Sequence, residues 1–156
     1  MENLFEQIEL HSDPTSSRYG CLLHWFGAPG LAWHYGIGLS DTHFFNTGPQ
    51  DWRILSSADR GIHPVPGIPT QDPAIVIGRL RHSLVLFESW PYDLLAWNCE
   101  HLARLVVIGD PICEQISRFP ILGSLLSWAC QGGRHPTAGS QLDRWLACHA
   151  PDLRLL

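Results

Sequence analysis

Short runs of aromatic and apolar residues, separated by clusters of Gly, Pro, Ser and Asp, fill the N-terminal part of the chain. Runs of this length that are bounded by turn residues are typical of β-strands. They predict strands at residues 18–26, 32–39, 42–47 and 51–57. Before them, a polar lead contains one more short strand at residues 4–10, and after them residues 60–69 form a Pro/Gly-rich loop. The short turns favour an antiparallel sheet.

Further along the chain, apolar residues recur at spacings of three and four, which predicts helices. The helix at residues 73–84 has Asp72 as its N-cap and Pro73 at its first position. The helix that begins at residue 99 stops at Gly109. Two shorter helices are predicted at residues 112–118 and at 140–149, where Ser140-Gln141-Leu142-Asp143 resembles a capping box.

The length and charge of the chain narrow its class. At 156 residues it has the usual size of one domain and is long enough to bury a core. We expect one α+β domain over residues 1–156, with a core at about 18–108 and a helical extension at about 111–150. The formal net charge is −5 without an acidic or basic block, so no nucleic-acid partner is indicated.

The cysteines and the N-terminus indicate the compartment. Five cysteines are spread along the chain without a CxxC pair, so we expect no structural zinc and no cofactor. The first residues are acidic and lack the apolar stretch of a signal peptide, which favours the reducing cytoplasm. Residues 119–130 are apolar but too few to span a bilayer. We expect them to pack on the domain, with a peripheral membrane or protein contact as the alternative.

One cysteine stands at the start of a predicted helix. An extended apolar run leads into Asn98 and Cys99, and the helical spacing begins at Cys99. A helix N-terminus has a positive dipole end and free backbone N–H groups, which lower a thiol pKa and can receive an oxyanion. Cys99 is therefore a candidate nucleophile, and the alternative is a small buried apolar residue.

A base for this nucleophile has to come from another part of the chain. His101 is two residues, or about 200° of helical rotation, from Cys99, so the two side chains point apart. The same spacing argues against a metal ion bound by both. The best candidate is His34, in the predicted strand at residues 32–39. Its alternative role is a strand histidine bonded to the backbone.

The residues around this pair resemble a known family. Asn98-Cys99-Glu100-His101-Leu102 is similar to the Asn-Cys-Glu-His-Phe signature of the lecithin–retinol acyltransferase-like family. His34, in His-Tyr-Gly-Ile-Gly-Leu, matches the first histidine of that family. The resemblance covers about residues 18–108 and implies a circularly permuted papain-like fold, related to the NlpC-type cysteine peptidases. The departures are Leu102 in place of Phe and Asn46 in place of the usual second His.

Asn46 can join His34 only if the hairpin between them has the right register. A two-residue loop at Ser40-Asp41 puts Asn46 on the face opposite His34. A three-residue loop or a bulge makes the two residues diagonal neighbours on one face. A triad of Cys99, His34 and Asn46 therefore predicts an odd loop. The alternative for Asn46 is a turn residue beside Thr47-Gly48-Pro49.

This set of residues predicts acyl transfer through a thiol. His34 takes the proton of Cys99, Asn46 fixes the imidazole tautomer, and Cys99 attacks an acyl carbonyl to form a thioester. Water or a second acceptor then releases the acyl group. The Cys99 backbone N–H is the first oxyanion donor, and Asn98 and Tyr35 are candidates for the second. Helix capping is the alternative for Asn98.

Three hypotheses about the function remain. The resemblance implies phospholipase A or acyl-transfer activity on a lipid or other acyl ester, and the relation to NlpC-type enzymes implies an amide such as a peptide bond. A non-catalytic interaction module on the same fold is the third. Four tryptophans flank the predicted site and either line an acyl groove or belong to the core. They are Trp25, Trp33, Trp90 and Trp97.

Overall fold

The computed structural model has a five-stranded antiparallel sheet in the order β4-β3-β2-β1-β5. The strands are β1 (Leu22–Phe26), β2 (Trp33–Gly38), β3 (His43–Asn46), β4 (Arg53–Ser56) and β5 (His63–Pro64). The structure describes residues 2–26, 33–48, 52–58, 61–69, 71–94, 96–117 and 133–154. The strands predicted at residues 18–26, 32–39, 42–47 and 51–57 all form and are shorter than predicted. Strand β5 lies in the predicted loop at residues 60–69.

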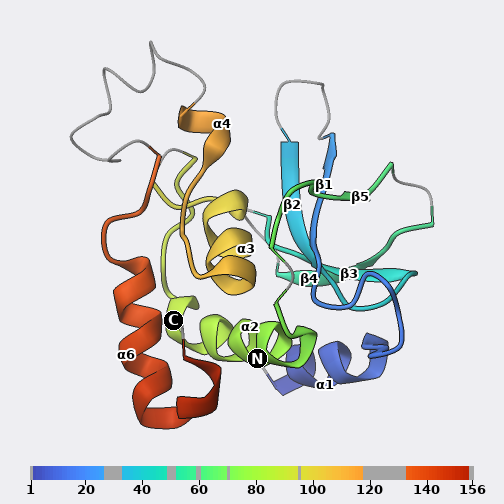
Figure 1. Ribbon diagram of the computed structural model, residues 1–156, viewed down its shortest axis with the longest axis horizontal. Coiled ribbons are helices and arrows are strands. Elements are labelled where there is room, and N and C mark those ends of the chain that lie inside the picture. Colours follow the sequence, from blue (N-terminus) through green and yellow to red (C-terminus); the bar gives the residue numbers. More distant parts are fainter. Residues whose placement is uncertain are drawn as a thin grey trace.

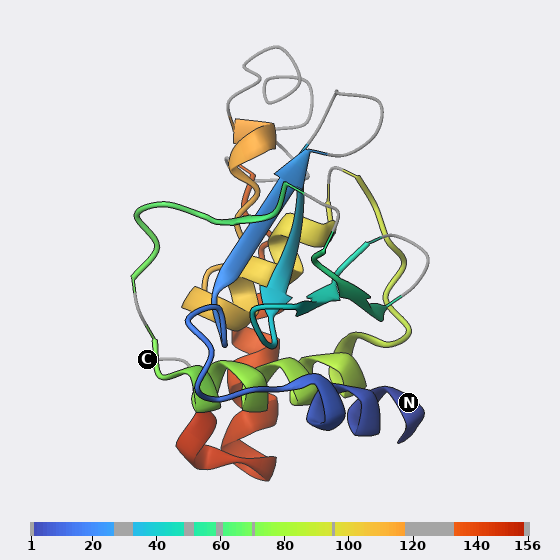
Figure 2. The same ribbon diagram turned by 90° about the vertical axis from the view of Figure 1, so that its right-hand side faces the viewer.

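Helices pack against this sheet, which confirms the α+β class. They are α1 (Glu2–His11), α2 (Pro73–Phe87), α3 (Cys99–Ile108), α4 (Glu114–Ser117), α6 (Ala138–His149) and a 3₁₀ turn η1 (Pro151–Leu153). Helix α3 stands beside β2, α2 crosses below both, and α6 packs on α2 (Figures 1 and 2). The α3 helix is therefore the element that links the sheet to the helical layer.

Helix α1 corrects a prediction, because residues 4–10 are helical rather than a strand. Leu4 and Ile8 are four positions apart, so they fall on one face of a helix. Ile8 is fully buried, and Leu4 and Phe5 pack against the same core. The spacing of the buried residues, which is close to one helical turn, decides the structure here.

Local sequence sets the ends of α2 and α3 as predicted. The Asp72 side chain accepts a hydrogen bond of 2.9 Å from the Ala74 N–H, and Pro73 is the first residue of α2. Gly109 ends α3 in the left-handed conformation, with a φ of 78°. Both helices are therefore bounded by the residues that the pattern indicates.

The last helix starts earlier than predicted. Helix α6 begins at Ala138, and Thr137 holds the N-cap position without a side-chain hydrogen bond. Ser140 lies inside the first turn, where its hydroxyl donates to the Thr137 carbonyl at 3.0 Å. The predicted capping box at residues 140–143 is therefore wrong.

The main core lies between the sheet and the helices and extends past the predicted core at residues 18–108. Fully buried members come from the sheet, such as Ile37, from α1, such as Ile8, and from α6, such as Leu142 and Leu146. A smaller cluster covers the other face of the sheet and consists of Leu23, Trp25, Phe44 and Ile62. The apolar segment at residues 119–130 lies outside the described residues.

The β2–β3 hairpin has the odd loop that the triad requires. Gly36 lies opposite Asn46 and Gly38 opposite Phe44, so residues 40–42 form a three-residue connection. His34 and Asn46 are therefore diagonal neighbours on one face of the sheet. His34 pairs with Trp25 of β1, which places this face on the side of the smaller cluster.

Candidate active site

Cys99 is the first residue of α3, where the sequence predicts it. The Asn98 side chain accepts hydrogen bonds from the Glu100 N–H at 3.0 Å and the His101 N–H at 3.2 Å. Its carboxamide nitrogen donates to the Leu94 carbonyl at 2.7 Å. The capping role of Asn98 is thereby confirmed, and its carboxamide is occupied by that role.

The structure brings Cys99 and His34 together. The Cys99 Sγ lies 4.0 Å from the His34 Nδ1. The imidazole stacks on Trp25, with ring centroids 5.8 Å apart, so the indole supports one side of the ring. Because Nδ1 faces the sulfur, Nε2 is the nitrogen left for a third residue. Cys99 and His34, which are 65 positions apart in the sequence, are thus neighbours in the structure.

The pair meets through a gap in the sheet. Strand β3 ends at Asn46, and the side chain of the next residue, Thr47, bonds to both β2 and α3. Its hydroxyl contacts the Tyr35 carbonyl at 2.7 Å and the Cys99 carbonyl at 3.0 Å. The Tyr35 N–H, on the same edge of β2, hydrogen-bonds to the Cys99 sulfur. The α3 N-terminus therefore occupies the position where β3 would continue.

Asn46 lies on the face of the sheet that carries His34, but the structure does not join them. The register makes the two residues diagonal neighbours, and the Asn46 side chain is half-buried. Within the described part of the chain, no hydrogen bond links the Asn46 carboxamide to His34. Asn46 is therefore placed near the pair and available to it, rather than bound to it.

A further residue at the sulfur, Tyr92, is absent from the sequence-based set. It is half-buried, and its hydroxyl hydrogen-bonds to the Cys99 sulfur. Burial and the neighbouring Cys99 raise the Tyr92 pKa well above its usual value, so the phenol keeps its proton. The signal in the sequence is modest, since Tyr92 stands seven positions before Cys99 in the same stretch.

The Cys99 thiol is more basic than its helix position suggests. Cys99 is 5% exposed, and burial raises its pKa. Hydrogen bonds from the Tyr35 N–H and the Tyr92 hydroxyl lower it, and the Glu100 carboxylate raises it. Burial likewise lowers the pKa of His34. The expected low thiol pKa is therefore wrong, and a neutral thiol faces a neutral imidazole.

A buried carboxylate organises the surroundings of this pair. Glu100 is fully buried and forms an ion pair with Arg104 at 2.8 Å. Its second oxygen accepts from the Cys113 thiol at 3.1 Å and from the Gln115 N–H at 3.3 Å. The Tyr35 phenol contacts Glu100 and Arg104. Tyr35 therefore reaches the Cys99 sulfur through its backbone N–H and not through its hydroxyl. This network holds residues 113–115 beside the α3 N-terminus.

His101 has a structural role, as its position two residues after Cys99 predicts. Its Nδ1 accepts a hydrogen bond from the Asn98 N–H at 3.2 Å, and its Nε2 contacts the Gly133 carbonyl at 2.8 Å. Because a carbonyl only accepts, Nε2 carries the proton. Burial lowers the pKa of His101 to about 4. The ring is thus a neutral link between α3 and the C-terminal part of the chain.

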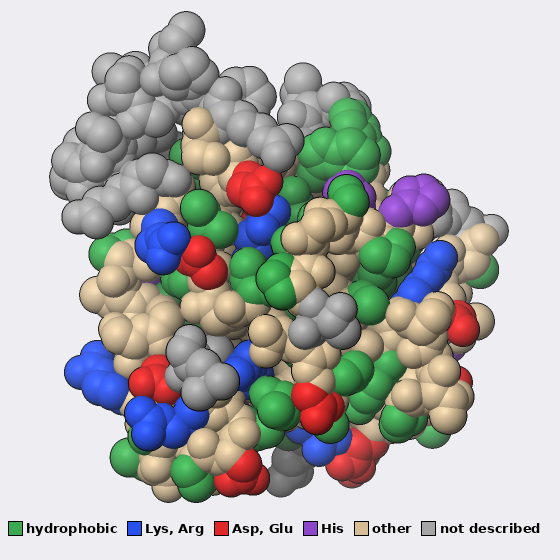
Figure 3. Space-filling model, viewed as in Figure 1, with side chains coloured by type: hydrophobic (Ala, Val, Ile, Leu, Met, Phe, Trp, Pro, Cys, Tyr) green, Lys and Arg blue, Asp and Glu red, His purple; other side chains and the backbone are tan. Residues whose placement is uncertain are grey.

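The four tryptophans divide between the core and the surface. Trp90 and Trp97 pack with Phe87 in the main core, and Trp25 supports His34. Trp33 is 38% exposed and, with Phe26 at 54%, forms part of the hydrophobic surface at the end of β1 and β2 (Figure 3). Trp33 is therefore the exposed tryptophan of the four, and its ring stacks on His24, on the face of the sheet opposite His34.

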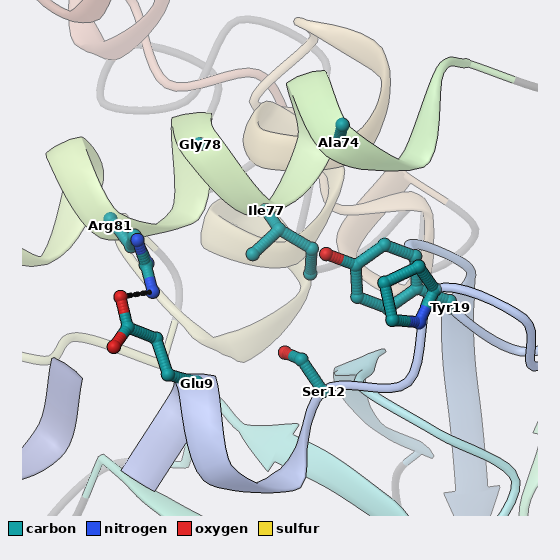
Figure 4. A pocket seen from close by; sticks show the side chains of 8 residues that line it. Glu9, Ser12, Tyr19, Ala74, Ile77, Gly78 and Arg81 are labelled. Atoms are coloured by element: carbon teal, nitrogen blue, oxygen red, sulfur yellow. Dashed lines mark hydrogen bonds and ion pairs between the residues drawn. The ribbon is translucent and has the colours of Figure 1, made fainter. Parts of the chain in front are cut away.

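Two pockets lie near these elements. One, of about 300 Å³, is lined by His24, Trp33, Tyr35, Arg104, Gln115 and residues 65–68, and so adjoins the site. The other, of about 330 Å³, lies between α1 and α2, where Glu9 and Arg81 form an ion pair of 2.7 Å (Figure 4). None of the predicted site residues lines this second pocket.

Comparisons with models of known protein families, with curated proteins and with solved structures found no match. Among the described residues, no three His, Cys, Asp or Glu side chains are grouped so that they could hold a metal ion. The helices in that part of the chain are each too short or too polar to cross a membrane.

Proposed function

We propose that this protein is a cysteine-dependent acyl hydrolase or acyltransferase, with Cys99 as the nucleophile and His34 as its general base. The observation that carries the proposal is the 4.0 Å approach of His34 Nδ1 to the Cys99 sulfur at the first residue of a ten-residue helix. A structural cysteine has no need of an imidazole on one side and two hydrogen-bond donors on the other. These donors are the Tyr35 N–H and the Tyr92 hydroxyl.

The neutral forms of both groups define the first chemical step. As the Cys99 sulfur attacks the acyl carbonyl, Nδ1 of His34 accepts the thiol proton and a C–S bond forms. The carbonyl oxygen becomes an oxyanion, for which the Cys99 N–H is the proposed first donor and the Tyr35 N–H, released from the sulfur, the proposed second. The leaving oxygen or nitrogen then takes the proton from His34 as its bond to carbon breaks.

The second step releases the acyl group. Water, or an acceptor alcohol or amine, gives a proton to His34 while it attacks the thioester carbonyl, and the Cys99 thiolate leaves and is reprotonated by the imidazolium. Asn46 is the third member of the proposed triad. A hydrogen bond donated by Nε2–H to its carboxamide oxygen would keep the Nδ1 lone pair directed at the sulfur.

The sequence resemblance supports a lipid or other acyl ester as the donor and a permuted papain-like arrangement of the fold. Action in the cytoplasm, and a membrane or protein contact through residues 119–130, are part of the same proposal. The relation to NlpC-type enzymes leaves a peptide or other amide as the alternative donor.

The decisive experiment follows Cys99 alkylation by iodoacetamide against pH, with mass spectrometry of the Cys99 peptide because other cysteines also react. Burial lowers the pKa of His34, so its imidazole stays neutral below pH 6.5. The rate of Cys99 alkylation should therefore fall only when the pH drops through that lowered pKa. We expect His34→Ala to slow the reaction at pH 7 at least roughly tenfold.

The matched control is His24→Ala, a half-buried histidine on the neighbouring strand β1. It should leave the alkylation rate unchanged, because its side chain lies on the other face of the sheet from His34. Equal rates in the wild type and His34→Ala would contradict the proposed pair. They would favour the non-catalytic interaction module.

A further inference from the structure

Among the described residues, the edge of β2 that faces β3 loses its partner strand next to the nucleophile. The backbone N–H and C=O groups of successive residues in a strand point to alternate edges of that strand. Those of Trp33, Tyr35 and Ile37 therefore all point toward β3. Strand β3 reaches Ile37 but ends at Asn46, opposite Gly36. Within the described residues, no strand therefore pairs with the part of this edge at Tyr35 and Trp33.

A side-chain amide fills the open edge at Trp33. Gln115 Oε1 accepts a hydrogen bond of 2.7 Å from the Trp33 N–H, and its Nε2 donates to the Trp33 carbonyl at 3.0 Å. These are the two bonds that one residue of an antiparallel neighbour makes. The Gln115 carboxamide thus stands in for a peptide backbone at this position.

This contact lies directly over the proposed site. Trp33 precedes His34, and it is two residues from Tyr35, whose N–H reaches the Cys99 sulfur. The Gln115 carboxamide also donates to the Glu100 carboxylate at 3.3 Å, next to Cys99 in α3. Gln115 therefore bridges the strand of the base and the helix of the nucleophile.

We propose that the edge of β2 at Trp33 is a backbone-binding subsite, in which the Trp33 N–H and carbonyl pair with the carbonyl and N–H of one extended substrate residue at the place that Gln115 occupies. The inference rests on the proposed function and selects its substrate class. A peptide or N-acyl amino acid has a residue with both groups, whereas a simple lipid ester has none.

The surroundings of Trp33 support this assignment. Thr47 and the α3 N-terminus already fill the position opposite Tyr35, because the Thr47 hydroxyl contacts the Tyr35 and Cys99 carbonyls. A substrate residue can therefore pair with β2 at Trp33, in place of Gln115, and its chain would leave the strand edge there to bring the reacting carbonyl to the Cys99 sulfur. The pocket of about 300 Å³ adjoins the same two residues, Trp33 and Gln115, and can hold a substrate side chain.

The test uses two chloroacetyl tripeptide probes that alkylate Cys99 by displacement of chloride. One has a backbone amide two residues from the electrophile, and the other has an ester at that place. The ester probe lacks only the N–H group that would donate a hydrogen bond to the Trp33 carbonyl. We expect the amide probe to react faster, and Gln115→Ala to raise the amide-to-ester rate ratio to roughly tenfold, because the competing carboxamide is gone.

Gln141→Ala is the matched control, since the carboxamide of Gln141 bonds within its own helix, to Thr137 at 3.4 Å. It should leave the ratio at the wild-type value. A ratio near one in both the wild type and Gln115→Ala would overturn the subsite and leave Gln115 as a tether for α4.

Hydrogen exchange gives a second readout that does not depend on rates. The Trp33 N–H should exchange faster in Gln115→Ala and regain protection once the amide probe is attached. Exchange that stays fast after labelling would also overturn the subsite.

Methyl methanethiosulfonate, which contains no amide, separates the two proposals. If it modifies Cys99 at equal rates in the wild type and in His34→Ala, His34 is rejected as the base. The amide-to-ester ratio of the tripeptide probes still reports on the subsite in that case.

Discussion

His101→Gln tests whether the histidine beside the nucleophile is a structural group that must stay neutral. The ring is fully buried, accepts from the Asn98 N–H and donates to the Gly133 carbonyl. A second proton on Nδ1 would break the Asn98 bond and charge a buried ring. Burial is the main reason that its pKa falls to about 4.

The sign and size of the effect follow from linkage. Between pH 6.5 and about 4, His101 binds a proton in the unfolded chain but not in the folded one, so the free energy of unfolding falls as pH falls. At about 1.36 kcal/mol per pH unit, the loss approaches about 3 kcal/mol at pH 4. Above pH 6.5 this contribution is fully present.

Urea unfolding of the wild type and His101→Gln, measured from pH 7.5 to pH 4, isolates this contribution. Glutamine can still donate to the Gly133 carbonyl but does not titrate. The stability of the wild type relative to the variant should fall by about 3 kcal/mol over this range. His149→Gln, at the exposed end of α6, controls for the loss of a histidine. Parallel stability curves for the wild type and His101→Gln would refute the reasoning.

Three other substitutions test separate parts of the site. Tyr92→Phe removes the hydroxyl donor at the Cys99 sulfur, so the thiol pKa should rise further and alkylation at pH 8 should slow about threefold; an unchanged pH–rate profile would exclude that bond. Asn46→Ala should slow Cys99 alkylation and change stability by less than about 0.5 kcal/mol, while an unaltered rate would remove it from the triad with His34. Gly36→Ala would place a β-carbon 2.5 Å from a β3 carbonyl oxygen, so urea unfolding should show a loss of about 2 kcal/mol. Wild-type stability would mean that the strands separate there at little cost.

Local patterns were sufficient to predict several of the elements that build the site. The apolar spacing after Cys99 and the stop at Gly109 give α3, and these signals come from residues that are close in sequence. The sequence left the register of the β2–β3 hairpin open, because a two-residue and a three-residue loop both fit it, and the structure has the three-residue loop that puts Asn46 on the His34 face. The strand predicted at residues 4–10 is wrong because the few apolar positions there fit both the period of a strand and that of a helix. The burial of Ile8 in the core decides between them.

The remaining features of the site depend on contacts between distant segments. Gln115 and Trp33 are 82 positions apart, and nothing in either local sequence indicates that a carboxamide will cover a strand edge. The thiol pKa is a similar case. The helix start at Cys99 suggests a lowered value, but the Asn98 side chain takes two of the free N–H groups and the surrounding core excludes water. Desolvation then outweighs the helix end.

The same burial connects the two proposals. Exclusion of water is the largest cause of the raised Cys99 pKa and of the lowered His34 pKa. Gln115 joins the two elements that carry this pair, so its removal from the β2 edge should admit water to them. The thiol pKa should then fall and the imidazole pKa should rise, which brings the pair closer to exchanging a proton. Binding of a substrate at Trp33 would displace Gln115 but keep water out. The shift of the two pKa values toward each other is therefore expected for Gln115→Ala without substrate, and not for the wild type with a substrate bound.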